Sequence, residues 1–411
     1  MNMRFRPYHL IAIVAMTAGC LVACGSSGSD AGSGSTPPPS SAPQPSTITK
    51  PTAINLYPSQ SASNSPLLRV MVTSVGSATV NMALGFDTGS AGVTLYAPTI
   101  FPASMVSASG FVFPAGQSSI TYNGITVTNV QGTRSYGTLN QTVEHGNLGF
   151  AELTFGDASG TVTTQVMPIF LFYSIDVTMG SAFAPNSYWQ GWFGVASTNG
   201  TIDVAGSTAP AGGFGGCATD STVTCYVVSA MKYIGYGSGV NAGFLLSPAA
   251  LQSCDSDTAG SCQPQPMLTV GVDPSVESGF NTTPLVCPPN GYVGPASIAG
   301  YPVCQKSIQV EVAVSGASAG SFSGYAVFDT GTSYMYLSTP TASVFPSGID
   351  TGSTVTITTP SGFNYAYTAD SSVTTNTNID SGGDGDSILG VQYFTTNAYL
   401  LDFTAGIVGW K

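Results

Sequence analysis

Two copies of the tetrapeptide Phe-Asp-Thr-Gly stand far apart in the chain, each at the end of an apolar run. The first places Asp87 after V-N-M-A-L-G-F, and the second places Asp329 after G-Y-A-V-F. One Asp-Thr-Gly is ordinary turn chemistry, because Asp and Gly both favour tight turns. Two carboxylates held together can do more, because one can activate a water and the other can protonate a carbonyl oxygen and later an amine. Like charges placed so close cannot both ionise, so their pKa values split.

The two copies belong to a longer internal repeat. Each is followed, later in the chain, by two apolar residues and a glycine in a similar frame. The first is followed by G-W-F-G-V-A at 191–196, and the second by S-I-L-G-V-Q at 387–392. A pattern that occurs twice over such a distance indicates two related lobes rather than a run of short solenoid units.

Two other short motifs in the chain match the sequence patterns of catalytic motifs. A third Asp-Thr-Gly begins at Asp350, but F-P-S-G-I precedes it, so we predict a surface turn that opens the strand V-T-I-T-T. The stretch G-A-S-A-G around Ser318 matches the serine-hydrolase pattern, which requires a histidine further along the chain. No histidine follows Ser318, and strand-like runs flank it, so we predict a hairpin loop. We expect His145 to be a surface residue of another hairpin.

The composition indicates an all-β protein whose acidic surface does not favour binding to nucleic acids. Of 411 residues, 43% are hydrophobic, 7% are charged and 50 are glycine, with short β-branched runs between turn residues. The net charge is −12, and we expect no nucleic-acid partner because no basic patch can be built. So acidic a chain suits acidic surroundings, although a generally acidic exported protein would have the same composition. The basic residues after the N-terminal segment are Lys50, Arg69, Arg134, Lys232, Lys306 and Lys411.

The N-terminal segment resembles a bacterial lipoprotein signal peptide over residues 1–23. Two arginines precede an apolar run that is too short to span a bilayer. The run ends in L-V-A-C, which resembles a lipobox with Cys24 as the lipidated residue; Cys20 in T-A-G-C is the rival, and an ordinary secretion signal is the alternative. Gly25 after the cysteine favours the outer membrane, facing the periplasm or the cell surface. Residues 24–51, rich in Gly, Ser and Pro, are predicted to be a disordered tether.

Six further cysteines fall into three close sequential pairs. An even number in an exported chain indicates disulfides, and among fifteen possible connectivities the close pairs are our prediction. No C-x-x-C occurs, so we expect no metal site. The predicted bonds are Cys217–Cys225, Cys254–Cys262 and Cys287–Cys304.

The order of these motifs resembles that of the pepsin-like aspartic peptidases. L-T-V-G-V-D-P-S-V-E-S-G-F-N-T-T-P-L at 268–285 and the ending at 387–410 resemble the strands that open and close the family's C-terminal lobe. The resemblance covers roughly residues 55–411. It implies an all-β, bilobed fold with an N-terminal lobe at 52–240, a C-terminal lobe at 241–411 and a cleft between them. It also implies a monomeric endopeptidase that needs no cofactor and acts on polypeptides.

The resemblance also assigns roles to residues. It makes Asp87 and Asp329 a catalytic pair that shares an attacking water. In each loop the threonine would cross-link the two loops, the glycine would offer its N–H, and the next hydroxyl would bond the outer carboxylate oxygen. These supporting residues are Thr88, Gly89, Ser90, Thr330, Gly331 and Thr332.

A hairpin flap with a tyrosine near its tip covers the cleft in this family. Tyr136, followed by Gly137, is our choice for that tyrosine; Tyr122, next to an Asn-Gly turn, is the rival. The family usually has a tryptophan a few residues after the first motif as partner of this tyrosine, and Thr94 stands there.

Only Lys50 is basic between Cys24 and Arg69, so we expect no inhibitory prosegment of the usual basic kind. The alternative function is a catalytically silent protein of this fold that binds a protein or glycan; intact motifs favour the enzyme.

Overall fold

The computed structural model describes residues 43–60, 67–136, 142–177, 190–204, 226–254, 262–288, 297–341, 343–372, 375–381 and 385–411. Contacts along the chain separate residues 1–40 from a compact unit at 41–411, to which all of these belong. The predicted signal peptide, Cys24, Gly137 and the Cys217–Cys225 pair lie outside the described residues. No helix in the described ranges is long and apolar enough to cross a membrane.

Strands dominate the described chain, which confirms the all-β prediction. The alternation of apolar and polar residues explains them, because successive side chains of a strand point to opposite faces. In β25 (Ile308–Ser315), with the sequence I-Q-V-E-V-A-V-S, the residues alternate strictly between buried and exposed. The helices among the described residues are short 3₁₀ turns: η1 (Ala97–Thr99), η2 (Ala230–Tyr233), η3 (Pro274–Gly279) and η4 (Val391–Thr395).

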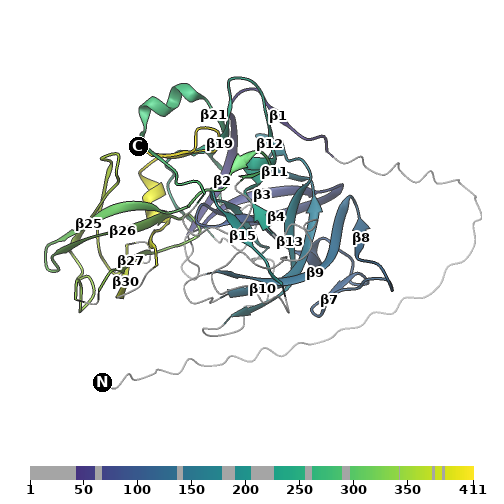
Figure 1. The fold of residues 1–411 in the computed structure, drawn as a ribbon, viewed down its shortest axis with the longest axis horizontal. Coiled ribbons are helices and arrows are strands. Elements are labelled where there is room, and N and C mark those ends of the chain that lie inside the picture. Colours follow the sequence, from purple (N-terminus) through teal and green to yellow (C-terminus); the bar gives the residue numbers. More distant parts are fainter. Residues whose placement is uncertain are drawn as a thin grey trace, which may run out of the picture. The chain divides into compact units, whose positions relative to one another are not determined.

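One seven-stranded sheet carries the second Asp-Thr-Gly. Its order is β29-β28-β25-β26-β31-β27-β30, and Asp329 directly follows β26. Figure 1 shows β25, β26, β27 and β30 gathered on one side of the unit, away from β7 to β10. The remaining bounds are β26 (Gly320–Phe328), β27 (Met335–Thr339), β28 (Thr354–Thr358), β29 (Asn364–Thr368), β30 (Thr377–Ser381) and β31 (Ser387–Leu389).

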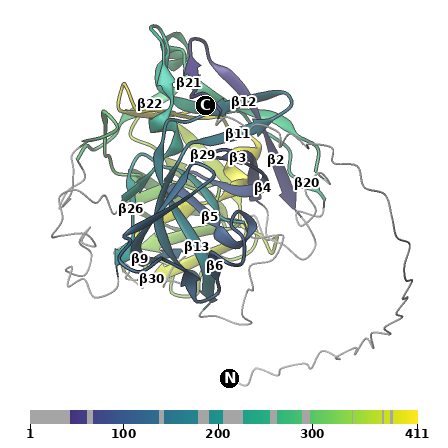
Figure 2. The same cartoon turned by 90° about the vertical axis from the view of Figure 1, so that its right-hand side faces the viewer.

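The first Asp-Thr-Gly ends a strand of a larger network of paired strands. Asp87 is the last residue of β4 (Ala78–Asp87), which pairs with β14 (Trp192–Val195); β14 pairs in turn with β5 (Ala91–Tyr96). In Figure 2, β5, β6, β9 and β13 face the viewer. The other strands of this side are β3 (Leu67–Val75), β8 (Ser119–Tyr122), β9 (Ile125–Tyr136), β10 (Thr142–Ala151), β11 (Leu153–Asp157), β12 (Gly160–Thr163), β13 (Met167–Val177) and β16 (Asp203–Val204).

Both halves repeat one strand arrangement, as the doubled sequence predicts. β4 pairs in parallel with β14, and β26 pairs in parallel with β31. In the first pair Phe86 lies opposite Phe193, and in the second Phe328 lies opposite Leu389. Each second strand then pairs antiparallel with the strand that follows the motif, β14 with β5 and β31 with β27. The motif strand and the apolar-apolar-Gly strand therefore form one structural unit, which occurs twice.

A shared sheet joins the two halves. β2 pairs with β21, which pairs with β19; β19 pairs with β32, β32 with β33, and β33 with β22. Residues from both predicted lobes, 52–240 and 241–411, therefore contribute to it. Its strands are β2 (Thr52–Gln60), β19 (Asn241–Leu246), β21 (Gln265–Val272), β22 (Asn281–Pro284), β32 (Tyr399–Asp402) and β33 (Ile407–Trp410), and β20 (Gln252–Ser253) pairs with the end of β2.

Four small sheets of two strands complete the described elements. They are β1 (Thr47–Ile48) with β18 (Gly235–Tyr236), β6 (Val106–Ser107) with β7 (Gly110–Phe111), β15 (Asn199–Thr201) with β17 (Tyr226–Val228), and β23 (Ser297–Ile298) with β24 (Tyr301–Pro302). The first of these corrects the predicted tether at 24–51. Thr47 and Ile48 pair with β18, and the apolar side chain of Ile48 is buried in the core, which favours this ordered position over exposure to water.

The phenylalanine of each Phe-Asp-Thr-Gly anchors its loop in the core. The Phe86 ring stacks on Phe193 with centroids 6.2 Å apart, and the Phe328 ring lies 5.4 Å from that of Trp410. Both phenylalanines are buried, which is worth roughly 1.5–3 kcal/mol for such a side chain. The apolar run before each motif therefore fixes where its aspartate lies.

The two imitation motifs are surface turns, as predicted, and they contact each other. Ser318 lies in the hairpin loop between β25 and β26, and its Oγ donates to Asp350 Oδ2 at 3.0 Å. Asp350 in turn lies in the turn before β28, and its N–H donates to Ser318 Oγ at 2.8 Å. His145 lies on β10 as a partly exposed residue, with Nε2 2.8 Å from Asp176 Oδ2. No histidine neighbours Ser318 in the described part of the chain.

Candidate active site

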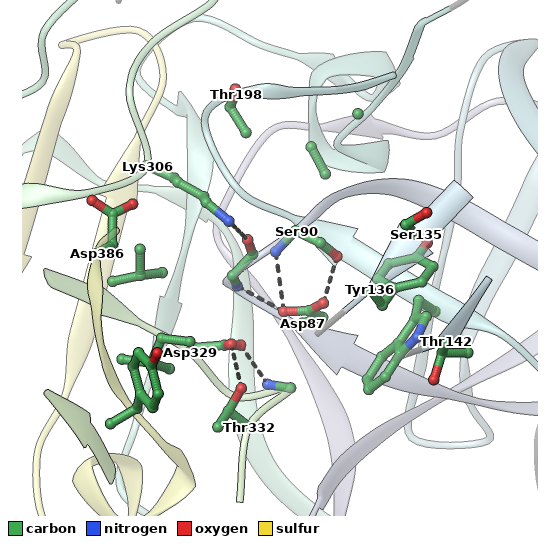
Figure 3. Close-up of a pocket in the computed structure, with 18 of the residues that line it drawn as sticks. Asp87, Ser90, Ser135, Tyr136, Thr142, Thr198, Lys306, Asp329, Thr332 and Asp386 are labelled. Carbon is green, nitrogen blue, oxygen red and sulfur yellow. Dashed lines mark hydrogen bonds between the residues drawn. The ribbon is translucent and has the colours of Figure 1, made fainter. Parts of the chain in front are cut away.

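The structure brings the two aspartates of the Asp-Thr-Gly loops together beside one pocket (Figure 3). The threonines beneath them cross-link the two loops. The N–H of Thr88 donates to Thr330 Oγ1 and the N–H of Thr330 donates to Thr88 Oγ1, both at 3.0 Å. Each hydroxyl donates onward at 2.6 Å to a carbonyl before the opposite aspartate, Thr88 to Phe328 and Thr330 to Phe86. Both threonines are buried. The contacts are symmetric, as the doubled sequence requires.

The glycines of the motif make room for the opposite aspartate. A Cβ built on Gly89 would lie 2.4 Å from Cγ of Asp329, and one on Gly331 would lie 2.7 Å from Cγ of Asp87. Neither glycine has a positive φ, so the reason for glycine is space rather than backbone conformation. Each loop therefore needs its glycine for the carboxyl group of the other loop.

Each carboxyl group is held by the residues that follow it. Asp87 Oδ1 accepts from the N–H groups of Gly89 at 2.7 Å and Ser90 at 3.1 Å, and its Oδ2 accepts from Ser90 Oγ. Asp329 Oδ1 accepts from the N–H of Gly331 at 2.7 Å, and its Oδ2 from Thr332 Oγ1 at 2.7 Å. Figure 3 shows these bonds around the two aspartates. The resemblance predicted the same supporting residues.

The environment of Asp87 favours the protonated form of its carboxyl group. Burial, the charge of Asp329 and a hydrogen bond with Asp329 raise the pKa of Asp87 to about 8, against the hydrogen bonds from Ser90 and Gly89, which lower it. Asp87 is 5% exposed, so its charged form is poorly solvated. A pair that holds one proton between two carboxyls offers both an acid and a base to a bound group.

A cleft of about 990 Å³ opens above the pair, large enough for several residues of an extended peptide. Strands from both halves line it. Its charged side chains besides the pair are Arg134, Asp203, Lys306, Asp380 and Asp386, and its aromatic ones are Tyr136, Trp192, Tyr334 and Tyr336.

Tyr136, the predicted flap tyrosine, lines this cleft at the end of β9. Its ring centroid lies 5.9 Å from that of Trp192, and burial raises the pKa of its phenol. The rival Tyr122 does not line the cleft; it ends β8 and packs on Phe101 at 5.4 Å. The Asn-Gly next to Tyr122 forms a two-residue hairpin turn with positive φ at Asn123 and its glycine, as its sequence predicts.

Trp192 is the residue that sequence reasoning missed beside Tyr136. The family's usual tryptophan position holds Thr94, and the structure supplies an indole from β14 instead. Thr94 helps to position this residue, because the main-chain N–H of Trp192 donates to Thr94 Oγ1 at 3.0 Å. Gly85 leaves room for the ring, since a Cβ there would lie 2.4 Å from Trp192 Cε3. The signal was present in the repeat G-W-F-G-V-A, where the tryptophan directly precedes the echoed apolar-Gly pair.

Lys306 is a second residue that the sequence did not single out. Its Nζ donates to the carbonyl of Gly89 at 2.6 Å, at the edge of the pair (Figure 3). Burial raises the pKa of nearby Asp386, and the Lys306 charge opposes that shift. The disulfide Cys287–Cys304 and buried Lys232, whose Nζ donates to the Pro302 carbonyl at 2.8 Å, hold the segment that carries Lys306. No sequence motif marks such a contact.

Two of the predicted disulfides are present, Cys254–Cys262 and Cys287–Cys304. Among the residues that the structure describes, no three His, Cys, Asp or Glu side chains are grouped so that they could hold a metal ion.

Comparisons with known proteins identify the fold alone. No family model matches the chain, and no curated protein matches it. Among solved structures, an aspartic proteinase from Irpex lacteus is similar with a TM-score of 0.50 at 15% identity, over 88% of this chain and 97% of that one. The basic 7S globulin from soybean has a TM-score of 0.49 at 13% identity, over 88% of this chain and 96% of that one. The chain thus has the bilobed, all-β fold of the pepsin-like aspartic proteinases.

Proposed function

We propose that the protein is an aspartic endopeptidase that hydrolyses polypeptides at acid pH through Asp87 and Asp329. The observation that carries this proposal is the symmetric pair itself. Two carboxyls lie on cross-linked loops, each accepts hydrogen bonds from the glycine N–H and the hydroxyl that follow it, and a peptide-sized cleft opens above them. A protein that only binds its ligand has no need for such a proton-sharing pair.

The chemistry follows from the shared proton. The ionised carboxylate takes a proton from a water, and the water oxygen attacks the carbonyl carbon of the peptide. The protonated carboxyl donates its proton to the carbonyl oxygen, giving a neutral tetrahedral diol. In the collapse of the diol, the ionised carboxylate takes a proton from one diol hydroxyl, which becomes the new carbonyl. The C–N bond breaks, and the protonated carboxyl gives its proton to the leaving amine. The two carboxyl groups act as one pair, so the roles of base and acid belong to the pair rather than to either residue.

We also propose that the chain works as an exported monomer, anchored in a bacterial membrane through a lipid on Cys24. The lipobox-like L-V-A-C supports this proposal. So do the two disulfides, because such bonds persist in oxidising compartments.

The test of the proposed activity is digestion of an unfolded protein by the full-length chain in detergent, with products identified by mass spectrometry. We expect internal cuts, which define an endopeptidase, and no cuts by the Asp329→Asn variant. Intact substrate at every pH, with folded wild-type protein, would refute the proposal and favour a catalytically silent binding protein.

A further inference from the structure

Three polar atoms in the cleft wall have no hydrogen-bond partner among the residues that the structure describes. They are Nη1 of Arg134 and both amide atoms, Nδ2 and Oδ1, of Asn199. Each side chain is 5% exposed, and each lines the same cleft as Asp87 and Tyr136. Buried polar groups in proteins are nearly always paired, so unpaired ones in a cleft wall indicate a partner that arrives with the ligand.

The chain holds both side chains firmly. The guanidinium of Arg134 donates from Nη2 to the carbonyl of Ala91 at 3.0 Å, and its Cζ lies 5.2 Å from the ring centroid of Tyr136. Gly200 lets it approach, because a Cβ there would lie 2.5 Å from Nη2. Asn199, the neighbour of that glycine, is fixed by pairing of β15 with β17. The free polar atoms are therefore pre-positioned, as a binding site requires.

The local charge favours a neutral ligand group. Glu144 lies opposite Arg134 in the register of β9 and β10 and is fully buried, and Asp203 lines the cleft nearby. An incoming carboxylate would meet these two acids as well as the guanidinium. A neutral amide has no such penalty, and its groups match the free atoms. Its oxygen can accept from Arg134 and from Asn199 Nδ2, and its N–H can donate to Asn199 Oδ1.

We propose that Arg134 and Asn199 form a subsite that receives the side-chain amide of a glutamine or asparagine in the substrate. The proposal rests on the proposed peptidase function, because it names part of the substrate of the same cleft. A site built to hydrogen-bond a polar group discriminates strongly against an apolar analogue, since its own buried polar atoms then stay unpaired.

The test measures peptide binding to the full-length Asp329→Asn variant, so that it does not depend on turnover. Fluorescent peptides of apolar sequence carry Gln, Glu or Met at each position in turn, because these three side chains are similar in size. At one position we expect Gln to bind about tenfold more tightly than Met, and more tightly than Glu. Adding Asn199→Leu brings the Gln-to-Met ratio to about one, whereas adding Asn81→Leu, at an exposed asparagine of β4, keeps the preference.

Several results would overturn the proposal. They are no preference at any position, no binding, a preference that survives Asn199→Leu, or tighter binding of Glu than of Gln. An equal loss for all three peptides in the Asn199→Leu variant would place a main-chain amide there and overturn the side-chain assignment.

The stability of the peptide-free protein is a second, independent readout. Asn199→Leu removes two unpaired buried atoms, so we expect an unchanged or higher melting temperature. A clearly lower melting temperature, or failure to fold, would show that the chain itself uses this amide, and would overturn the subsite. Failure of the peptidase proposal appears elsewhere, as peptides that bind with the expected preference but are never cut by the wild type.

Discussion

The carboxyl group of Asp329 lies directly against the α-carbon of Gly89, across the junction of the two loops. A single methyl group on Gly89 would lie 2.4 Å from Asp329 Cγ, and the mirror-image contact joins Gly331 to Asp87. This relationship explains why glycine completes both motifs: each loop is shaped around the carboxyl group of the other. One added carbon atom at either glycine would therefore push the opposite carboxyl group away and change the distance between the two carboxyls.

Gly89→Ala and Gly331→Ala should therefore each lower kcat by about a hundredfold, because displacement of a catalytic group by about 1 Å has an effect of this order. The measurement is steady-state cleavage of one peptide by each purified variant. Gly279→Ala is the matched control, since a Cβ there meets only Lys411 Nζ at 3.9 Å. If Gly89→Ala kept more than about half of the wild-type rate, the contact would have no role in catalysis.

Thr88→Val should destabilise the fold, because it removes the acceptor of the Thr330 N–H and the donor to the Phe328 carbonyl. An unpaired buried group costs about 1–3 kcal/mol, so the free energy of unfolding in urea should fall by at least that amount. Thr88→Ser keeps the hydroxyl and should restore most of the loss. Equal stability of the Val and Ser variants would argue against the cross-link.

The raised pKa of Asp87 predicts how stability depends on pH. The folded protein holds this proton more tightly than the unfolded chain, so the contribution is fully present below the unfolded pKa and is lost as pH rises toward about 8. Asp87→Asn removes the titrating group. Between about pH 4 and pH 8, wild-type stability should therefore fall relative to that of the variant. Parallel curves for the two proteins across this range, measured by thermal unfolding, would contradict the prediction.

Tyr136 and Tyr122 can be separated by matched substitutions. Tyr136→Leu should lower kcat/KM by about tenfold or more, because it removes the ring that lines the cleft and packs on Trp192. Tyr122→Leu, in a hairpin that packs on Phe101, should change stability but leave kcat/KM within about twofold. The reverse pattern would transfer the flap role to Tyr122.

Lipid attachment can be tested with the two cysteines of the N-terminal segment. Cells fed a labelled fatty acid should label the wild type and Cys20→Ala, but not Cys24→Ala, which should also stay out of the membrane fraction. Label that survives Cys24→Ala and disappears with Cys20→Ala would move the anchor to the rival T-A-G-C.

The sequence predicted those features that depend on local pattern. The doubled Phe-Asp-Thr-Gly and its echoed apolar-Gly strands predicted two equivalent units, and β4–β14 and β26–β31 form them. Close spacing along the chain was enough to predict the pairing of Cys254 with Cys262. The Pro- and Gly-containing stretch before Asp350 was enough to predict a surface turn there rather than a third catalytic aspartate.

Contacts between distant segments could not be predicted in this way. Trp192 takes the place of the expected tryptophan from a strand 98 residues away from Thr94; the motif G-W-F-G-V-A contains this residue but does not indicate that its ring packs on Tyr136. Lys306 reaches the Gly89 carbonyl across the two halves for a similar reason. The strand at Thr47 and Ile48 was missed because two residues after a Pro-rich segment are too few to show a period. Its pairing with β18 and the burial of Ile48 depend on residues far away in the chain.

The most direct test of the central claim is cleavage of an unfolded protein from about pH 2 to pH 8 by the wild type, Asp87→Asn and Asp329→Asn. We predict activity that is highest in acid for the wild type and absent, at every pH, from both variants while they remain folded. Cleavage that persists in either single variant would contradict a mechanism in which the two carboxyls act as one proton-sharing pair.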